Sequence, residues 1–576
     1  MPHEIRIPDL GADIDGVSIV EWHVEEGAAV SSGDVLADLE TDKATVELEA
    51  DANGTLGRIV HSAGGEPAAP GALVALLLLE GEDEAALDDY TPASAAAASA
   101  ETHNDTDVSD DETPDYDVVV IGSGPGGYVA AIRAAQLGLR TAVVEREDLG
   151  GVCLNWGCIP TKTLLRSAEV FENMKHADEF GLSVDGLSFD MGKVVKRSRD
   201  VAGKLNGGVK HLLKKNGVEV LMGDARLQGR GRVSVAMADD ESRSLLATNI
   251  ILATGARTRV LPGFEPDGDL IWTYRDAMTP ESAPASMLII GAGAIGVEFA
   301  SFFNSFGSKV TLVEMQSHVL PVEDEEISGF ARKAFEKQGI EVLTDSRVTS
   351  LERHEDHVIA TIDVNGESRT QRFDKVISAV GVVGNHESLG LENTAVEIDG
   401  PFVRADEWCR TDEPGVFAIG DLAGAPCLAH KASHEGVACV ERIAGLETAH
   451  PVDRDRVPGC TYSRPQVASV GLTEAAATKA GYSIRVGRFP FQGNGKAIAL
   501  GEADGLVKTV FDANTGELLG AHMVGAEVTE LIQGYGIAQT LETTEQELMS
   551  TIFPHPTLSE MMHEATLDAF DRVIHI

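Results

Sequence analysis

Two cysteines stand close together in a setting that favours thiol chemistry. Residues 150–160 read GGVCLNWGCIP, so four residues separate Cys153 from Cys158. Two thiols at this spacing can close a small, reducible disulfide. Proline is common in the first helical turn, so Pro160 predicts that Cys158 lies at a helix N-terminus, where the pKa of a thiol falls and the thiolate is favoured. A metal site is the weaker alternative, because no second Cys/His pair lies nearby in the sequence.

A histidine near the C-terminus is followed by an acid at short spacing. Residues 555–560 read HPTLSE. Histidine can move protons near neutral pH, and Glu560 can hold its second ring nitrogen and stabilise the imidazolium. The alternative is a surface histidine before a helix, and a lone histidine would carry little weight because the chain has 17. The Pro-Thr-x-x-Glu context favours acid/base chemistry at His555.

A lysine stands at a predicted turn in the N-terminal part of the chain. Lys43 lies in the segment ETDKA, residues 40–44. Glycines repeat on both sides of it at equal spacing, with Gly16, Gly27 and Gly33 recurring as Gly54, Gly65 and Gly71. Short strands between glycine turns predict a small two-sheet sandwich with pseudo-twofold symmetry. A lysine at a hairpin turn is most often only solvated, but the symmetric repeat around Lys43 favours covalent attachment of a group.

The elements that must position the cysteines begin with a glycine-rich turn. An apolar strand leads into residues 122–127, GSGPGG, and a helical segment follows. In such a turn Gly122 permits the tight bend, Gly124 lets the backbone approach a pyrophosphate, and Gly127 lets helix and strand pack closely. The phosphates would lie at the helix N-terminus. Glu145 ends the next strand, where an acid accepts ribose hydroxyls.

The same pattern recurs further along the chain. A second apolar strand precedes residues 291–296, GAGAIG, and the strand after the next helix ends in Glu314. The glycines with the same three roles are Gly291, Gly293 and Gly296. Glu314 would repel a 2′-phosphate and no arginine follows closely, so NAD is favoured over NADP. A structural glycine turn without a ligand is the alternative, but the whole pattern occurs twice, which predicts electron transfer between two bound cofactors.

Size and charge limit the kinds of protein this chain can be. At 576 residues it is expected to divide into several domains. The net charge of −46 repels nucleic acid and anionic lipid, so neither is an expected partner. No apolar run reaches the ~20 residues of a membrane helix, and the start, MPHE, resembles no signal sequence, so a cytoplasmic location is expected. The charge also favours a salt-adapted host; the alternative is that an acidic linker inflates the total.

From Asp115 to the C-terminus, the chain resembles the flavoprotein disulfide reductases, and among them the dihydrolipoyl dehydrogenases most closely. The resemblance rests on the cysteine segment, both glycine turns and the HPTLSE segment. Three further segments belong to it: 253–255 (ATG), 416–421 (VFAIGD) and 428–432 (LAHKA). It implies an α/β fold with two doubly wound, Rossmann-like domains that bind FAD and NAD, followed by an α+β dimerisation domain.

The resemblance also implies cofactor contacts. Asp421 is expected to contact the ribityl chain of the flavin, and the segment around Ala429 to lie beside the flavin ring. Lys162 corresponds to the family lysine near that ring and Glu298 to its carboxylate partner; an ordinary surface salt bridge is the alternative for this pair. The remaining expected cofactor positions are Ala225, Gly255 and Gly381. The frequent family segment Gly-Arg-x-Pro-Asn appears here as GVVGN, so no arginine contact is expected from that loop.

A mechanism in two halves follows from the resemblance. Reduced lipoamide attacks Cys153, with His555 of the opposite subunit as the base, so an obligate homodimer is implied. The disulfide opens and leaves Cys158 as a thiolate against the flavin, and electrons pass through FAD to NAD as hydride. Mercuric reductase and glutathione reductase share this fold and are the alternatives. The first usually carries extra cysteine pairs, which this chain lacks, and the second prefers NADP, which Glu314 disfavours.

The N-terminal segment resembles the lipoyl domains of 2-oxoacid dehydrogenase acyltransferases. Lys43, in Asp-Lys-Ala, stands where those domains carry the lipoylated lysine, and it lacks the flanking methionines typical of biotinyl domains. The resemblance implies covalent lipoate on Lys43 and service to 2-oxoacid dehydrogenase complexes through their lipoylated acyltransferase. A docking module without bound lipoate is the alternative.

These features predict a linear order of domains. A lipoyl-type all-β sandwich, 1–82, precedes a flexible linker rich in alanine and acids, 83–114. The predicted parts that follow are an FAD domain with the redox disulfide, 115–262, an NAD domain, 263–388, a central segment completing the FAD site, 389–455, and a dimerisation domain with the catalytic histidine, 456–576.

Overall fold

The chain divides into two compact units, Met1–Asp107 and Val108–Ile576. The computed structural model describes residues 3–7, 17–40, 45–50, 52–61, 63, 72–78, 113–237 and 241–576. Lys43 and residues 83–112 of the expected linker lie outside the described residues, so the expectations for them stay predictions.

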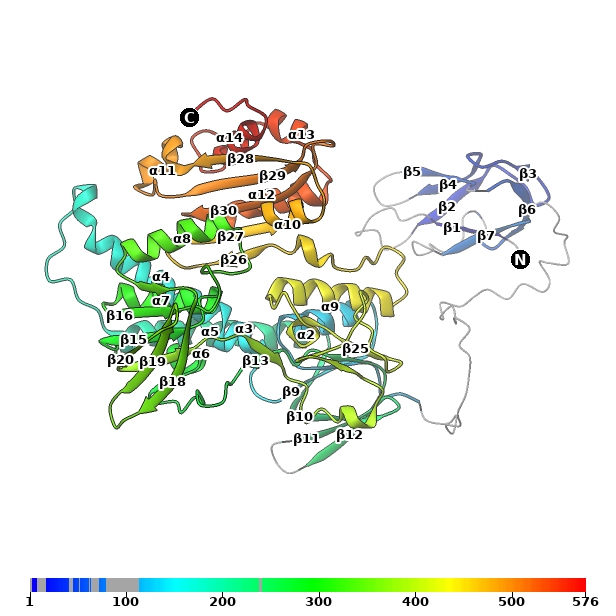
Figure 1. Cartoon of the computed structure of the whole chain (residues 1–576). Coiled ribbons are helices and arrows are strands. Elements are labelled where there is room, and N and C mark those ends of the chain that lie inside the picture. The colour runs from blue at the N-terminus through cyan, green and yellow to red at the C-terminus, as the bar shows by residue number, and fades with distance from the viewer. Residues whose placement is uncertain are drawn as a thin grey trace. The chain divides into compact units, whose positions relative to one another are not determined.

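The N-terminal unit is a sandwich of two antiparallel sheets (Figure 1). The sheets have the orders β2-β4-β5 and β1-β7-β6-β3. Leucines from both sheets, including Leu39 and Leu77, are fully buried between them, which confirms the predicted sandwich. The strands are β1 (His3–Arg6), β2 (Ser18–Trp22), β3 (Ala29–Val30), β4 (Val35–Glu40), β5 (Thr45–Glu49), β6 (Gly54–Ile59) and β7 (Leu73–Leu78).

The larger unit begins with a mostly parallel sheet in the order β11-β10-β9-β8-β12-β25. One face packs on the helices α2, α5 and α9. The other face packs on the antiparallel extension that β11 forms with β10 and β12, and on the segment 389–405. With both faces covered, β9 is buried along its whole length, as is typical of parallel strands. The elements are β8 (Tyr116–Ile121), α2 (Pro125–Gln136), β9 (Thr141–Glu145), α5 (Met191–Lys215), β10 (Glu219–Gly229), β11 (Arg232–Met237), β12 (Ser242–Leu252), β25 (Val416–Ala418) and α9 (Ala429–Ile443).

A second, wholly parallel sheet has the order β14-β21-β15-β16-β17. Its core is unusually aromatic, with Phe299, Phe302 and Phe303 of α7 buried against it. An antiparallel sheet, β18-β19-β20, follows β17. The elements are β14 (Ile271–Trp272), β15 (Ser286–Ile290), α7 (Ala294–Ser305), β16 (Lys309–Val313), α8 (Glu325–Lys337), β17 (Glu341–Leu343), β18 (Ser346–Arg353), β19 (Val358–Val364), β20 (Glu367–Phe373) and β21 (Lys375–Ser378).

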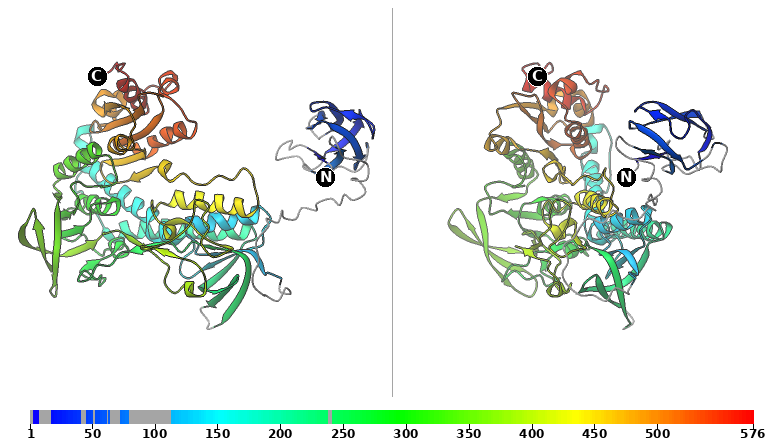
Figure 2. Two further views of the ribbon diagram at one scale, coloured as in Figure 1. Left: turned by 45° about the vertical axis from the view of Figure 1, so that its right-hand side comes forward. Right: turned by 90° about the vertical axis from the view of Figure 1, so that its right-hand side faces the viewer.

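The C-terminal part, yellow through orange to red in Figure 1, is an antiparallel sheet in the order β26-β27-β30-β29-β28 with helices packed on it. In both views of Figure 2 it lies at the opposite end of the larger unit from β11 and β12. The elements are β26 (Gly459–Thr461), β27 (Gln466–Gly471), α10 (Glu474–Lys479), β28 (Ile484–Pro490), α11 (Gly495–Leu500), β29 (Leu506–Asp512), β30 (Leu518–Gly525), α12 (Val528–Thr540), α13 (Glu545–Ser550) and α14 (Glu560–Ala569).

Shorter elements connect these parts. Two helices carry the cysteine segment, and one 3-10 turn carries Asp421. The remaining elements are α3 (Gly151–Trp156), α4 (Cys158–Lys175), η1 (Ala177–Phe180), β13 (Ala256–Thr258), α6 (Tyr274–Ala277), β22 (Val382–Gly384), η2 (Leu391–Asn393), β23 (Ile398–Asp399), β24 (Phe402–Val403), η3 (Gly420–Ala423), η4 (Arg454–Arg456) and η5 (Phe491–Gly493).

The predicted fold class is confirmed: two parallel α/β sheets, an α+β C-terminal part and an all-β N-terminal unit. The antiparallel additions at β11 and at β18–β20 are structural findings beyond that prediction. Of the helices in the described part of the chain, none is long and apolar enough to cross a membrane.

Candidate active site

Cys153 and Cys158 form a disulfide with 4.7 Å between their Cα atoms. Cys153 lies inside the short helix α3, whereas Cys158 is the first residue of α4, in the helix-terminal position that Pro160 predicted. Gly157 joins the two helices, and a Cβ atom there would lie 2.9 Å from the carbonyl oxygen of Val152. The close approach of α3 to the start of α4 therefore requires a glycine between the helices.

Side chains of α5 hold the turn that contains the disulfide. The amide of Asn155 donates to the carbonyl oxygens of Leu149 and Gly151, both at 2.9 Å. Asn206 of α5 donates to that same Leu149 oxygen at 2.9 Å and to the Asn155 side chain at 3.3 Å. The redox turn is thus anchored by side-chain bonds from within and from α5.

Two arginines flank the indole ring of Trp156, which lies between the cysteines. The guanidinium of Arg199 is 4.4 Å from the ring centroid and that of Arg275 is 5.2 Å from it. Two buried nitrogens of Arg199 have no hydrogen-bond partner, so the cation–π contact with the indole ring is the main interaction that offsets the cost of burying this guanidinium. Arg275 also pairs with Glu147 at 2.6 and 2.8 Å. None of these contacts was predicted, because each joins segments far apart in the sequence.

The first glycine turn has the geometry of a phosphate cradle. Gly122 has a φ of +100°, and a Cβ there would lie 2.4 Å from the carbonyl oxygen of Ala253. A Cβ on Gly127 would lie 1.9 Å from the carbonyl oxygen of Gly122, so the turn and α2 fit only without side chains. In contrast, a Cβ on Gly124 would meet no atom within 4 Å. The open space at Gly124, beside the N-terminus of α2, fits a pyrophosphate.

The second glycine turn repeats this geometry. A Cβ on Gly291 would lie 2.3 Å from the Ala379 oxygen, a Cβ on Gly296 would lie 1.9 Å from the Gly291 oxygen, and a Cβ on Gly293 would meet nothing within 4 Å. The match with the first turn at all three glycines supports two cofactor sites of the same kind.

The two acids that follow these turns are held in matching ways. Glu145 accepts from the Ser123 amide at 2.9 Å, the Ser123 hydroxyl at 2.6 Å and the Glu147 amide at 2.9 Å. Glu314 accepts from the amides of Ala292 at 2.8 Å and Gln316 at 2.9 Å. Each oxygen of Glu314 therefore makes one bond and keeps a second lone pair, which fits ribose hydroxyls.

Lys162 and Glu298 form the expected pair, with 2.9 and 3.0 Å between Nζ and the two carboxylate oxygens. The carboxylate is 5% exposed, so this is not an ordinary surface salt bridge. The amide of Tyr462 donates to Glu298 at 2.9 Å, and Nζ of Lys162 lies 4.6 Å from the Tyr462 ring centroid. This pair joins α4, which carries Cys158, to α7, which follows the second glycine turn. Tyr462 is a contributor that the sequence did not single out.

The turn η3 places Asp421 next to α9. Its carboxylate has a pKa raised by burial, which Lys431 partly offsets and Glu435 reinforces. Ala429 is the first residue of α9. Among the other expected cofactor positions, Gly255 has a φ of +68° with open space around a Cβ, Gly381 has a φ of +96°, also with open space, and Ala225 packs against the core from β10.

His555 and Glu560 form a dyad at the start of α14. His555 Nδ1 lies 3.0 Å from Glu560 Oε1, and the amide of Thr557 donates to Oε2 at 2.9 Å. Burial raises the pKa of Glu560, but the Thr557 amide and His555 outweigh it, so the net pKa is lowered. The imidazole of His555 is 79% exposed. Among the described residues, no bond joins it to either redox cysteine of its own chain.

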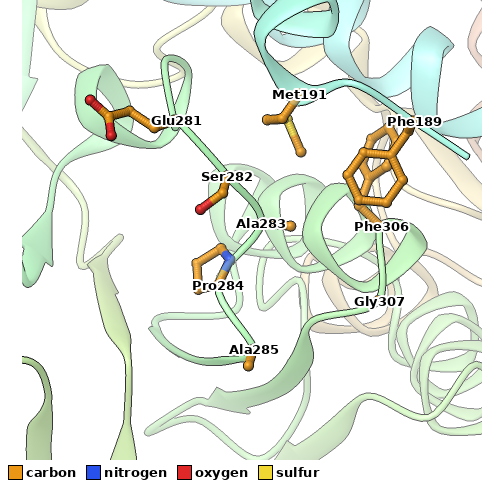
Figure 3. A pocket seen from close by; sticks show the side chains of 9 residues that line it. All are labelled: Phe189, Met191, Glu281, Ser282, Ala283, Pro284, Ala285, Phe306 and Gly307. Atoms are coloured by element: carbon orange, nitrogen blue, oxygen red, sulfur yellow. The ribbon is translucent and has the colours of Figure 1, made fainter.

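An open cavity of about 360 Å³ lies away from these residues. The rings of Phe189 and Phe306 form one wall, with centroids 4.8 Å apart, and the segment 281–285 forms another (Figure 3). None of its lining residues belongs to the disulfide turn, the glycine turns or the histidine dyad. The cavity is therefore separate from the candidate active site.

Comparison with known families places this geometry in context. The family described as pyridine nucleotide-disulphide oxidoreductase matches residues 116–436, and its dimerisation domain matches residues 457–566. The biotin/lipoyl family, described as biotin-requiring enzyme, matches residues 3–77.

Similar proteins fall into the same group. A dihydrolipoyl dehydrogenase of Rhizobium etli is 55% identical over 476 residues, which cover 80% of this chain and 99% of the relative. One of Zymomonas mobilis is 55% identical over 461 residues, with 80% and 99% covered. The solved structure of LpdA from Mycobacterium tuberculosis is similar with a TM-score of 0.73 at 27% identity, over 78% of this chain and 98% of that one. The flavoprotein disulfide reductase RclA from Escherichia coli has a TM-score of 0.70 at 26% identity, over 78% and 99%.

Proposed function

The chain belongs to the pyridine nucleotide-disulphide oxidoreductase family, and from this membership we propose that it is a dihydrolipoyl dehydrogenase. It oxidises protein-bound dihydrolipoamide to lipoamide and reduces NAD, through the Cys153–Cys158 disulfide and FAD. One observation carries this proposal: the disulfide lies at the N-terminus of α4 and follows, in the sequence, a glycine turn with the geometry of a phosphate cradle.

The reaction starts with an exchange at sulfur. A thiol of dihydrolipoamide gives its proton to Nε2 of His555 and its sulfur attacks Cys153 Sγ, so that the Cys153–Cys158 bond breaks and Cys158 leaves as a thiolate. The second substrate thiol then attacks the substrate sulfur of the mixed disulfide, and lipoamide leaves. Cys153 departs with the proton that His555 returns, and His555 takes up the proton of the second substrate thiol. The balance is one oxidised substrate, with two electrons and two protons held as the Cys153 thiol, the Cys158 thiolate and the His555 imidazolium.

Residues of this chain stabilise each charge that develops during the reaction. The N-terminus of α4 stabilises the thiolate of Cys158. Glu560 stabilises the imidazolium of His555 from Nδ1, which leaves Nε2 for the substrate. FAD, when bound, supplies the two-electron acceptor between the dithiol and NAD. Gly122, Gly124, Gly127 and Glu145 would hold its nucleotide part, and the equivalent residues of the second turn, ending in Glu314, would hold NAD.

Two copies of the chain form the working unit in this proposal. The matched dimerisation domain covers the segment that carries His555, whose side chain is 79% exposed within one chain. We propose that it serves the disulfide of the other subunit. The predicted internal boundaries, 115–262, 263–388, 389–455 and 456–576, belong to the same proposal.

The N-terminal unit is proposed as a carrier that bears lipoate on Lys43. Support comes from the family match over residues 3–77 and from the segment ETDKA that contains Lys43 in the sequence. The partners would be 2-oxoacid dehydrogenase complexes, through their lipoylated acyltransferase. Expression in a host that supplies a lipoate ligase should add a lipoyl group to the wild type and not to Lys43→Arg, as intact mass would show. An unmodified wild type would leave the docking-module alternative.

A cytoplasmic location and a salt-adapted host complete the proposal. Among the described residues four cysteines are free, Cys409, Cys427, Cys439 and Cys460, which fits a reducing compartment. The net charge of −46 creates self-repulsion that salt screens.

The test is NAD reduction by free dihydrolipoamide, measured across a range of salt concentrations for the wild type and Cys153→Ser. The proposal expects rapid NADH formation that the substitution abolishes, and a rise in rate with salt if the host is salt-adapted. If the wild type binds FAD but does not oxidise dihydrolipoamide at any salt concentration, the substrate assignment is wrong, although the assignment of the fold still holds.

A further inference from the structure

Lys431 is a fully buried lysine that has no role in the proposed reaction. Its side chain is 0% exposed. Its Nζ atom donates to the carbonyl oxygens of Gly424 at 2.7 Å and Gly420 at 3.2 Å, and lies 3.4 Å from Glu435 Oε1. Removing an ammonium group from water is costly unless partners replace the water. These partners all belong to one turn and to the helix that packs on it.

Glu435 holds the same turn from its other side. It is one helical turn after Lys431 on α9 and is 2% exposed. Its Oε2 atom accepts from the amide of Gly420 at 2.8 Å, and its Oε1 atom lies 3.2 Å from Arg454 Nη2. Lys431 and Glu435 together therefore bind both the N–H and the C=O of Gly420, the first residue of η3.

The turn that they hold carries Asp421. Packing leaves this turn little conformational freedom, because a Cβ on Gly420 would lie 3.1 Å from the Cβ of Ala432. Burial raises the pKa of Asp421, Lys431 lowers it, and Glu435 raises it. Burial, reinforced by the charge of Asp421, raises the pKa of the Cys427 thiol to about 11, so this thiol adds no charge to the cluster. Arg454 contacts the cluster through Glu435. Two cations, Lys431 and Arg454, therefore balance two carboxylates, those of Asp421 and Glu435.

We propose that Lys431 is a positioning residue for the flavin. With Glu435 it fixes the turn Gly420–Ala423, and its charge keeps Asp421 an ionised acceptor for the hydroxyls of the ribityl chain. A carboxylate accepts stronger hydrogen bonds than a neutral carboxylic acid. The inference rests on the proposed FAD site, in which Asp421 contacts that chain.

Flavin-free protein titrated with FAD, followed by flavin fluorescence, measures the effect without reference to turnover. We expect Lys431→Met and Asp421→Asn each to weaken FAD at least tenfold, which corresponds to ~1.4 kcal/mol. Because both act through one carboxylate, the double variant should be little weaker than either single one. Lys508→Met is the matched control, since Lys508 is also a buried lysine, 2% exposed and held by carboxylates, but lies on β29. Its FAD affinity should stay within about threefold of the wild type, a change of under ~1 kcal/mol.

The pH dependence separates charge from mere packing. Ionised Asp421 accepts stronger hydrogen bonds from the ribityl hydroxyls than neutral Asp421 does, so FAD affinity should fall as pH drops and Asp421 takes up a proton. Without Lys431 the pKa of Asp421 rises further, so the affinity of Lys431→Met should begin to fall at higher pH than that of the wild type. A parallel pH profile in the two proteins would overturn the proposed role of the charge.

The outcomes distinguish this inference from the proposed FAD site. If Asp421→Asn binds FAD like the wild type, the FAD site itself is wrong and the inference falls with it. If Asp421→Asn weakens FAD but Lys431→Met behaves like Lys508→Met, only the inference is wrong. If Lys431→Met does not fold, the double variant should regain a cooperative melt, because it removes the uncompensated carboxylate. A double variant that stays unfolded would also overturn the inference.

Discussion

Cys158 begins a helix while Cys153 lies inside one. In the proposed mechanism the helix terminus stabilises a thiolate at Cys158, and Cys153 exchanges with substrate. Pro160 was sufficient to predict the helix-terminal position of Cys158, whereas the exchange role of Cys153 came from the family resemblance. The contact of Tyr462 with Glu298 was not predictable, because it joins segments that meet only in the folded chain.

Glu314 gives the most direct residue-scale prediction. In the proposed NAD site Glu314 accepts the ribose hydroxyls, so Glu314→Gln would remove a charged acceptor, and charged hydrogen bonds contribute about 1.5–3 kcal/mol. The KM for NAD should therefore rise about 10–100-fold, and discrimination against NADP should fall. Steady-state kinetics with both nucleotides measures this. Glu341→Gln, on the next strand, removes an acid that pairs with Arg369 instead and is the control. Unchanged kinetics in Glu314→Gln would contradict the assignment of the second turn to NAD.

At the scale of elements, buried ion pairs join parts that the sequence shows only as separate segments. Lys508 of β29 is 2.8 Å from Asp324, the N-cap of α8, 2.8 Å from Glu474 of α10 and 3.0 Å from Glu326. The strands and helices themselves were predictable from apolar runs and glycine turns. Their docking was not, since nothing in the local pattern links residue 324 to residue 508.

The pH dependence of this cluster follows from its pKa shifts. Burial raises the pKa of Asp324, but Lys508 outweighs it, so the net pKa is lowered. Burial lowers the pKa of Lys508, but the carboxylates outweigh it, so the net pKa is raised. The stability from Asp324 is present above its unfolded pKa of about 3.9 and is lost as pH falls through the folded value. The stability from Lys508 is present below its unfolded pKa of about 10.4 and is lost as pH rises through the folded value.

Lys508→Met tests the cluster. Removing one partner of a buried ion pair typically costs about 3–5 kcal/mol, and the free energy of unfolding should fall by that order near neutral pH. Chemical denaturation from pH 3 to 11 measures it, and the variant should lose the plateau between the two limits. Lys479→Met, an exposed lysine on α10, is the control. A loss below about 1 kcal/mol, as for a surface pair, would show that the cluster does not stabilise the domain contact.

At the scale of the whole molecule, the chain contains a unit that matches the biotin/lipoyl family and a unit of the disulphide oxidoreductase family, and the proposed function requires two copies of the second unit. The repeat of glycines predicted the sandwich, and the two glycine turns predicted two nucleotide domains. No local pattern predicts the return of β25 and α9 to the first sheet, because that return depends on long-range packing; only the family resemblance implied that residues 389–455 complete the FAD site.

Mixed dimers test whether His555 acts across subunits. Cys153→Ser and His555→Gln should each be inactive alone. After dissociation and random reassociation, half of the dimers are mixed, and each mixed dimer has one complete site, so about a quarter of wild-type activity should return. If His555 instead serves its own chain, no mixed dimer has a complete site and the mixture stays inactive.

The central claim is that electrons pass from dihydrolipoamide through the Cys153–Cys158 pair to NAD. The most direct measurement is thiol labelling under anaerobic conditions, with the labelled cysteines identified by mass spectrometry. Dihydrolipoamide alone should open the pair and make Cys153 and Cys158 available to the label. Adding NAD before the label should close the pair again and protect both. A pair that stays closed while NADH forms, or that opens but is not closed again by NAD, would contradict the relay.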